Sequence, residues 1–317
     1  MVDLLIIGSG PAGLACAIEC VRKGLSHLIL EKGGLTDAIR RFPTNMTFFS
    51  TPELLEIGNV PFITSTFRPS RVDALRYYQR VAKEYQLQVR YDEMVVSITS
   101  GPGGFLVKTN GTGFSARNVV VAAGYYDHPN PYEIPGSKLP KVHRYYTEPF
   151  QYFGRNVAIV GGRNSAVDMA LELFRHGVEV TMIHRGPRLS EGVKYWLLPD
   201  IENRMKAGDI KSHFDSTIAE IRDRTIIVEG KQRLEIPNDH VFVMIGYRPD
   251  NGLLETAGVR IEPGSLSPVH DPQSMETNVP GLFVAGSIAA GKFNNKIFIE
   301  NGRLHGARIV ATITKSH

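Results

Sequence analysis

The sequence predicts an α/β protein built on two parallel sheets, because it contains two β-α-β units of the same design. In each unit a short apolar strand leads into a glycine-rich turn that opens a helix, and a second apolar strand follows. The turns are residues 8–13 and 161–166. A third observation separates the two units. The second strand leads into Glu31 in the first unit, but into His184 and Arg185 at the same distance from the first glycine in the second unit.

The first unit is expected to start with strand Val2–Ile7 and to continue with a helix and the strand His27–Leu30. The apolar stripe of that helix is Leu14, Ala17, Ile18 and Val21. Residues 36–70 are expected to be irregular apart from a short helix at 52–57, and Ser70 is a suitable N-cap for a helix that reaches Tyr85. Further strands are expected at 95–98, 105–109 and 119–123.

A Pro-rich stretch at 128–136 predicts a crossing into the second unit. There we expect strands Asn156–Val160 and Glu179–Ile183 around a helix with Val167, Ala170, Leu171 and Phe174 on one face, then strands at 225–228 and 240–245. Residues 246–249 return the chain to a buried strand before Gly286 and to a final helix that begins near Ile299. The first domain is therefore expected to be discontinuous, 1–124 plus 248–317, with the domain 125–247 inserted in it.

The residue that follows each second strand indicates the ligand. A glycine turn followed by an acid is typical of a Rossmann-like dinucleotide site, in which the acid binds a ribose diol, whereas a basic pair suits a ribose that carries a phosphate. We therefore expect FAD in the first domain and NADPH in the second. The expected FAD turn is Gly8, Ser9, Gly10, Pro11, Ala12 and Gly13, followed by Glu31 and Lys32. The expected NADPH residues are Gly161, Gly162, Arg163, Asn164, Ser165, Ala166, His184, Arg185, Arg188, Lys194 and Gly246.

Arg163 departs from the glycine pattern, because it stands where the middle glycine allows a pyrophosphate to approach the backbone. Two alternatives stay open for its side chain. The guanidinium could bind the phosphate itself, or it could face solvent. NADPH rather than NADH is predicted mainly from Arg185, which stays charged at any relevant pH.

Composition excludes several classes of protein. The 317 residues carry 36 Lys and Arg against 32 Asp and Glu, a balance that argues against nucleic-acid binding. Apolar runs are only as long as strands, so no membrane segment is expected, and the first segment predicts a strand rather than a signal peptide. A cytoplasmic location is expected.

The two cysteines, Cys16 and Cys20, are predicted to be buried in the first helix, where their spacing is poor for a disulfide. No C-x-x-C dithiol is present in the sequence.

Longer motifs make the chain similar to a known family over its full length. They are G-S-G-P-A-G (8–13), F-P-T-N-M-T-F-F-S-T (42–51), E-I-G-N-V-P-F-I (56–63), A-A-G-Y-Y (122–126), G-G-R-N-S-A (161–166), K-Y-W-L-L-P-D (194–200), M-I-G-Y-R-P-D (244–250) and I-F-I-E-N-G-R-L-H-G (297–306). With these motifs the chain resembles the thioredoxin-reductase-like flavoproteins, and among them the bacillithiol-disulfide reductases, also called bacilliredoxin reductases.

The resemblance implies FAD, NADPH as electron donor, a homo-oligomer such as a homodimer, and a disulfide of a small thiol or of a redoxin as acceptor. It assigns segments 42–51 and 286–302 to the flavin surroundings. The residues expected there and at the adjoining strand end are Asn45, Thr47, Phe49, Ala123, Gly124, Gly286, Ser287 and Ala289. Lys194, Trp196 and residues 297–302 are expected to contact NADPH or the acceptor.

Two positions depart from the family pattern. Ala12 stands where bacilliredoxin reductases commonly carry a cysteine near the cofactor, and Ser287 stands where many wider relatives place an aspartate. We therefore expect electrons to pass from flavin to the acceptor without a protein dithiol. A ferredoxin or flavodoxin acceptor, a flavin monooxygenase and a non-catalytic redox sensor stay open as alternatives.

The chemistry is expected to belong to the flavin N5 atom, and no catalytic side chain is assigned. His128 and His143 are candidate proton donors, although an isolated histidine is more often structural. No Cys, His and Asp residues are spaced as metal ligands, so no metal is expected.

Overall fold

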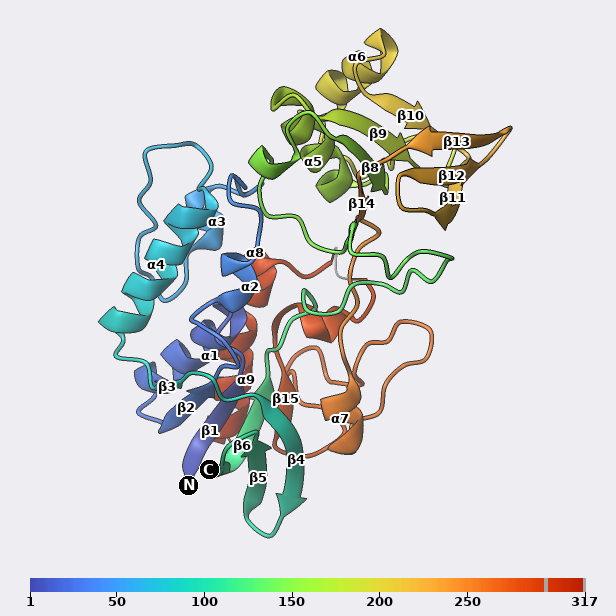
Figure 1. The fold of residues 1–317 in the computed structure, drawn as a ribbon. Coiled ribbons are helices and arrows are strands. Elements are labelled where there is room, and N and C mark those ends of the chain that lie inside the picture. The colour runs from blue at the N-terminus through green and yellow to red at the C-terminus, as the bar shows by residue number, and fades with distance from the viewer. Residues whose placement is uncertain (294–295, 316–317) are drawn as a thin grey trace. The chain divides into compact units, whose positions relative to one another are not determined.

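The computed structural model describes residues 1–293 and 296–315 (Figure 1). The described chain forms two compact units. The first unit consists of Met1–His128 and Tyr247–His317, and the second consists of Pro129–Gly246.

The sheet of the first unit has the strand order β3-β2-β1-β6-β5-β4, with β15 beside β6. Its strands are β1 (Val2–Ile7), β2 (His27–Leu30), β3 (Val89–Arg90), β4 (Val95–Gly101), β5 (Gly104–Thr109), β6 (Gly113–Val121) and β15 (Leu282–Val284). Strands β3, β2, β1, β6 and β15 run parallel, whereas β4, β5 and β6 form an antiparallel meander. The carboxyl ends of β1, β2, β6 and β15 therefore meet at one edge, where ligands of such sheets bind.

The helices of the first unit are α1 (Pro11–Arg22), α2 (Asp37–Arg40), α3 (Pro52–Leu55), α4 (Arg71–Glu84), α7 (Gly252–Thr256), η2 (Gly286–Ala290), α8 (Ile299–Gly302) and α9 (His305–Lys315). Helix α4 begins after Ser70 as predicted, because Ser70 and Asp73 form a reciprocal capping box. Helices α1 and α9 lie together in Figure 1, and a Cβ atom on Gly306 would come within 2.8 Å of the backbone of Ala15 and Cys16. Glycine thus permits this close helix contact.

Several expected boundaries of the first unit are wrong: the helix expected at 52–57 ends at Leu55, the strand expected at 95–98 reaches Gly101, and the strand expected at 119–123 begins at Gly113. The final helix is not continuous from Ile299, because α8 and α9 are separated at residues 303–304. Arg303 is the C-cap of α8, with its N–H still bonded to the carbonyl oxygen of Ile299 at 3.0 Å, and its guanidinium donates a hydrogen bond to the carbonyl oxygen of Glu53 at 3.0 Å. Strand β6 ends at Val121 and not at Ala123, so residues 122–124 already belong to the loop at the carboxyl edge.

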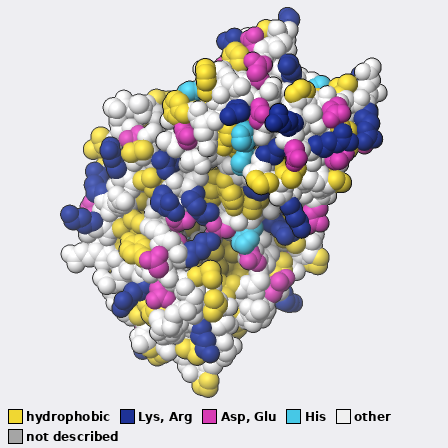
Figure 2. Space-filling model, viewed as in Figure 1, with side chains coloured by type: hydrophobic (Ala, Val, Ile, Leu, Met, Phe, Trp, Pro, Cys, Tyr) yellow, Lys and Arg dark blue, Asp and Glu magenta, His cyan; other side chains and the backbone are white. Residues whose placement is uncertain are grey.

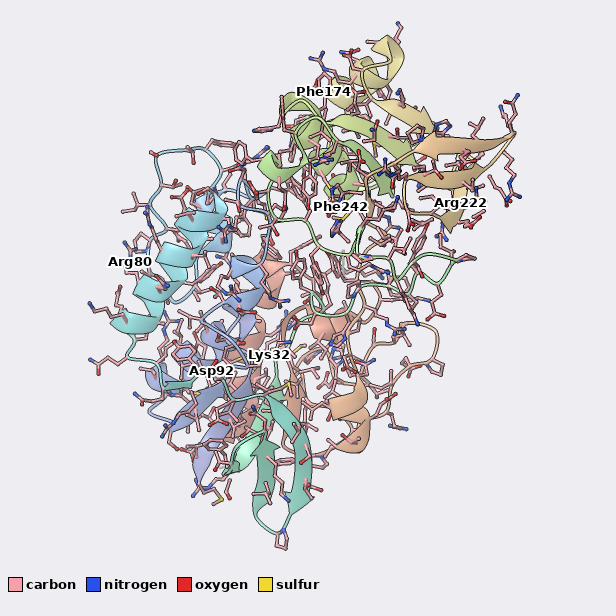
Figure 3. The ribbon with its side chains drawn as sticks, viewed as in Figure 1. Lys32, Arg80, Asp92, Phe174, Arg222 and Phe242 are labelled. Atoms are coloured by element: carbon pink, nitrogen blue, oxygen red, sulfur yellow. The ribbon has the colours of Figure 1, made fainter. Side chains whose placement is uncertain are left out.

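The second unit has a parallel sheet in the order β10-β9-β8-β14-β7. Its strands are β7 (Val142–His143), β8 (Asn156–Val160), β9 (Glu179–Ile183), β10 (Lys211–His213) and β14 (His240–Val243). An antiparallel sheet of β11 (Thr217–Ile221), β12 (Thr225–Glu229) and β13 (Arg233–Pro237) follows β10, and the helices are η1 (Phe150–Tyr152), α5 (Asn164–Arg175) and α6 (Leu198–Ala207). Phe242 of β14, labelled in Figure 3, is fully buried in the core of this unit.

The expected α/β class is confirmed in both units, with a parallel sheet in the second and a mixed sheet, antiparallel at β4 and β5, in the first. Strand β14 ends at Val243, two residues before the expected end; the N–H of Met244 still donates to the carbonyl oxygen of Val160 at 2.8 Å, and the chain leaves the sheet after this last ladder bond. On the face seen in Figure 2, Lys and Arg side chains lie interspersed with Asp and Glu in each unit. Among the described residues, no helix has the length and apolar character needed to cross a bilayer.

Candidate functional site

The first glycine turn lies between β1 and α1, with one side closed and one side open. Gly8 has φ +105°, and a Cβ atom there would lie 2.7 Å from the carbonyl oxygen of Ala122. A Cβ atom on Gly13 would lie 2.0 Å from the carbonyl oxygen of Gly8, so the helix starts directly against the turn. At Gly10 no atom lies within 4 Å of the Cβ position. The turn is therefore packed against the sheet and leaves its backbone accessible at Gly10.

Glu31 directly follows β2 and lies beside this turn. Its side chain is buried, with 6% of the residue exposed. Oε2 accepts hydrogen bonds from the N–H and the hydroxyl of Ser9, both at 2.8 Å, and Oε1 accepts one from the N–H of Gly33 at 3.0 Å. A carboxylate has about four acceptor positions, so acceptor capacity is left for a ligand. Contact with a ribose stays a prediction.

Lys32, labelled in Figure 3, forms an ion pair with Asp127, its Nζ atom lying 2.6 Å from Oδ2. Arg41 also bonds to Asp127 and bridges to Asp37 of α2 at 2.8 Å. Burial raises the pKa of Asp127, but the hydrogen bonds and charges of Lys32 and Arg41 outweigh it and hold the pKa below its ordinary value. Lys32 is thus engaged by a carboxylate of its own unit.

The turn after β15 packs against the first turn of α1. A Cβ atom on Gly286 would lie only 2.8 Å from the Cβ atom of Ala12, and one on Gly124 would lie 3.7 Å from Oγ of Ser287. The structure therefore brings the glycine turn, the loop after β6 and the turn after β15 to the same edge. Of the other predicted residues here, Pro11 begins α1, Ala289 is buried and Ala123 is exposed.

Segment 42–51 reaches this edge through aromatic contacts. The rings of Phe42 and Tyr126 meet edge to face with centroids 4.9 Å apart. Thr47 pairs with Ser70 in an isolated bridge. Asn45 and Thr47 are exposed and Phe49 is half-buried, and their contact with a flavin stays a prediction. Within the predicted segment 286–302, Asn294 and Asn295 lie outside the described residues.

Both cysteines are buried in α1 and unpaired, as predicted. Burial, followed by the nearby charges of Asp3 and Glu19, raises the pKa of Cys20 to about 12. Burial raises the pKa of Cys16 still further. Neither thiol is therefore poised to become a nucleophilic thiolate near neutral pH.

The second glycine turn lies between β8 and α5, and the ring of His184 packs against its backbone. Gly161 has φ +150°, and a Cβ atom there would lie 2.5 Å from the carbonyl oxygen of Met244. A Cβ atom on Gly162 would lie 2.7 Å from the ring of His184, so the ring rests on the turn. The N–H of His184 donates to the carbonyl oxygen of His213, at the end of β10, at 2.9 Å.

Positive charge at this edge comes from arginines rather than from His184. Burial lowers the pKa of His184 below 6.5, and the charges of Arg185 and Arg163 lower it further. Arg163 is the N-cap residue of α5 and is exposed, as is Arg185. Arg188 is also exposed and forms an ion pair with Glu191 at 2.5 Å. Whether Arg163 meets a phosphate stays open.

Side-chain hydrogen bonds of Asn164 hold the loop at 190–194 against the second turn. Its Oδ1 atom accepts from the N–H of Lys194, and its Nδ2 atom donates to the carbonyl oxygen of Gly192, both at 2.9 Å. Lys194 is thereby held beside the start of α5, with Nζ 5.8 Å from the ring centroid of Trp196. Of the other predicted residues, Ser165 is exposed, Ala166 is buried, and Gly246 accepts a backbone hydrogen bond from Asn130 at 3.0 Å.

The candidate proton donors lie in the two different units. In the second, Nε2 of His143 lies 3.1 Å from Nδ1 of His240, and burial followed by the charge of His240 lowers the pKa of His143. In the first, Nε2 of His128 lies 3.6 Å from Oδ2 of Asp250. Among the described residues, no group of three or more His, Cys, Asp or Glu side chains is arranged to hold a metal ion.

Comparison with known proteins now adds to this geometry. Residues 5–286 match the family model described as "Pyridine nucleotide-disulphide oxidoreductase". The chain belongs to this family. It is 42% identical over 314 residues to "Bacilliredoxin reductase Bdr" of Bacillus subtilis, an alignment that covers 98% of this chain and 97% of the relative. This identity places it with the bacilliredoxin reductases, and it is an oxidoreductase.

Solved structures agree with this assignment. "Bacillithiol Disulfide Reductase Bdr (YpdA) from Bacillus cereus" superposes with a TM-score of 0.97 at 42% identity, covering 100% of this chain and 99% of the other. Thioredoxin reductase of Lactococcus lactis superposes with a TM-score of 0.79 at 22% identity, covering 99% and 98%, and shares the fold. The resemblance and the thioredoxin-reductase-like fold class predicted from sequence are thus confirmed.

Sequence reasoning gave no role to two residues that the structure places at the first site. Asp127 pairs with Lys32, and His305 bonds to Gly286. Asp127 lies in the loop that follows β6, six residues after Val121, so no strand-end pattern marked it. His305 lies within a family motif, but only the fold shows that its ring is buried against the turn after β15.

Proposed function

We propose that the chain is an NADPH-dependent FAD enzyme that reduces a disulfide, with FAD bound by the first unit and NADPH by the second. One observation carries the proposal. Two glycine turns, each placed between a parallel strand and a helix, are followed by a carboxylate, Glu31, in one unit and by cationic Arg185 in the other. An acid suits the unmodified ribose of FAD, and an arginine suits the 2′-phosphate of NADPH.

The first turn fits a pyrophosphate. The space at Gly10 lets a phosphate approach the backbone, and the N–H groups at the start of the twelve-residue helix α1 point toward it. Pro11 lacks an N–H but occupies the first helical position, where that donor is least needed. Gly8–Gly13 would hold the pyrophosphate, Glu31 the ribose, and Gly124 and Ser287 the region beyond it.

The second turn fits a phosphorylated dinucleotide in a different way. With Arg163 in the place of the middle glycine, the guanidinium supplies charge-assisted donors where the first turn supplies open backbone. Arg185 follows β9 at the edge where a 2′-phosphate would bind. The uncharged ring of His184 covers Gly162 and would support the adenosine.

A bound flavin would supply the redox chemistry, by which the hydride of NADPH and one proton from solvent would convert a disulfide to two thiols. This chain's own residues bind and orient the two dinucleotides. With Ala12 at the family's cysteine position, and with Cys16 and Cys20 buried, no protein thiol takes part in the proposed path. The acceptor is proposed to be bacillithiol disulfide or a bacilliredoxin disulfide, because the relatives carry these names.

The proposal includes the partners and setting expected from the sequence, namely a homo-oligomer that works in the cytoplasm on a small-thiol or redoxin disulfide. A ferredoxin or flavodoxin is the competing acceptor, since Ala12 removes the family thiol. The same experiment decides between these acceptors.

The test is anaerobic reoxidation of the flavin. Purified protein loaded with FAD is reduced with one equivalent of NADPH and then mixed with bacillithiol disulfide, oxidised bacilliredoxin or oxidised ferredoxin, while flavin absorbance is followed. We expect reoxidation by a disulfide, and no loss of rate in a Cys16→Ala/Cys20→Ala variant. Reoxidation by ferredoxin alone would refute the disulfide assignment. A loss of rate in the double variant would refute the path without a protein thiol.

A further inference from the structure

His305 is a buried histidine that makes a specific contact with the turn after β15. It is the first residue of α9 and is 6% exposed. Its Nδ1 atom lies 3.1 Å from the backbone nitrogen of Gly286. A backbone N–H can only donate, so Nδ1 must accept, and the imidazole must be in its neutral form with the proton on Nε2.

Gly286 is the first residue of η2 and is held on several sides. It has φ +72°, and a Cβ atom there would lie 2.8 Å from the Cβ atom of Ala12. A Cβ atom on Gly302 would in turn lie 3.3 Å from Cα of Gly286. The residue is therefore fixed between the first turn of α1 and the end of α8, and His305 supplies the partner for its N–H.

We propose that His305 is a positioning residue of the FAD site: its neutral imidazole fixes Gly286, and so holds the turn that carries Ser287 against the glycine turn. This inference rests on the proposed function. The imidazole acts on the ligand through the backbone rather than by contact with it. Its contribution is to preorganise the edge where β1 and β15 end.

The surroundings keep the ring neutral. Burial, followed by the charges of Arg308 and His270, lowers the pKa of His305 to about 4. Arg308 lies one turn along α9 and donates to the carbonyl oxygen of Pro272 at 3.0 Å. Nδ1 of His270 lies 2.7 Å from the carbonyl oxygen of Pro268. The acceptor on Nδ1 is thus available throughout the neutral range.

The test compares His305→Leu with His305→Asn and a matched control. Leucine removes the acceptor and keeps apolar volume, whereas the amide oxygen of asparagine can accept from Gly286. The control is His27→Leu, because Nε2 of His27 also accepts from a backbone N–H, that of Gln88 at 3.3 Å, but at the opposite end of the sheet. FAD affinity, the visible spectrum of bound flavin and its midpoint potential are measured in the folded proteins. Amide exchange of residues 284–291 is measured without flavin.

We expect His305→Leu to weaken FAD binding at least about tenfold, to alter the spectrum and potential, and to speed exchange at 284–291. We expect His305→Asn to restore most of these properties and His27→Leu to change none of them. Equal defects in the Leu and Asn variants, or FAD affinity within twofold of wild type in His305→Leu, would overturn the inference. Wild-type protein that takes up no FAD would instead refute the proposed function, and faster exchange in His305→Leu alone would still support the contact with Gly286.

Discussion

The two glycine turns pack against their sheets in a similar way, but they differ on the side that would face a ligand. In each, the first glycine has positive φ and lies against the carbonyl oxygen of the residue just after a neighbouring parallel strand, that of Ala122 for Gly8 and that of Met244 for Gly161. The open side of the first turn is bare backbone at Gly10, whereas the corresponding position of the second is Arg163. The close approach of the first glycine to a carbonyl oxygen is therefore common to both turns, and the side chains around them set the charge.

The position of the third glycine in the pattern shows how much room each turn leaves for a side chain. Gly13 lies so close to Gly8 that a Cβ atom would come within 2.0 Å of an oxygen. The second turn carries Ala166 at this position, and the Cβ atom of that alanine lies 3.1 Å from where a Cβ atom on Gly161 would be. The second helix thus stands slightly further from its turn, and the same substitution should have unequal effects in the two units.

The largest expected effect is that of Gly13→Ala. The added methyl group would overlap the carbonyl oxygen of Gly8, so we expect a loss of about 3 kcal/mol or more in the free energy of unfolding. Gly10→Ala is the matched control, because nothing lies within 4 Å of its Cβ position and its φ is −67°. It should leave the stability of the flavin-free protein within about 0.5 kcal/mol and weaken FAD binding. Thermal unfolding and FAD titration separate the two effects, and equal stability of both variants would contradict the comparison.

Acid should act in opposite directions on the two units. The pKa of His305 falls from 6.5 to about 4 in the first unit. A lowered pKa gives stability that is present above pH 6.5 and lost as pH falls through 4, an effect of about 3 kcal/mol. In the second unit burial, followed by the charge of Glu172, raises the pKa of Asp168 from 3.8 to about 6. Stability from Asp168 is therefore present below pH 3.8 and lost as pH rises through 6.

Asp168→Asn sharpens this comparison. The neutral amide removes the cost of a half-buried carboxylate, so the variant should gain about 1–3 kcal/mol at pH 8 and little at pH 4. Denaturant unfolding at the two pH values, followed by a probe in the second unit, provides the measurement. A gain that is the same at both pH values would mean that ionisation of Asp168 is not its cause.

The smallest expected effect concerns dinucleotide choice. Arg185→Ala should raise the KM for NADPH about tenfold and that for NADH less than twofold, since only NADPH carries the phosphate. Arg188→Ala is the control: Arg188 is paired with Glu191, and its loss should raise the KM for NADPH about threefold or less. Steady-state kinetics with both donors measures this. Equal changes for NADPH and NADH in Arg185→Ala would refute the phosphate assignment.

Local patterns in the sequence were sufficient to predict the β-α-β units. Strand Val2–Ile7, the helix after it and strand His27–Leu30 each carry a clear apolar pattern, and Ser70 carries the polar side chain that its cap requires. Short elements such as β7 and β10 were not predicted, because two or three residues are too few to show a periodic pattern of apolar side chains. Their strand character comes from pairing with β14 and β9.

The site was predicted where function lies in the turn itself, at Gly8–Gly13 and Glu31. It was not predicted where function depends on contacts distant in sequence. The ion pair of Lys32 with Asp127 and the bond of His305 to Gly286 depend on how β6, β15 and α9 meet at the edge of the sheet. The lowered pKa of His184 likewise follows from its partial burial against Gly162 and from the charges of Arg185 and Arg163, neither of which the sequence pattern shows.

The buried cysteines have a practical consequence for measurement. Cys16 and Cys20 are buried in α1, and the pKa values of their thiols are raised. Maleimide reagents at neutral pH should therefore modify neither of them. A cysteine introduced on the surface of each unit would then be labelled selectively in the otherwise unaltered chain. Fluorophores at two such positions would report the distance between the units in solution as NADPH is added.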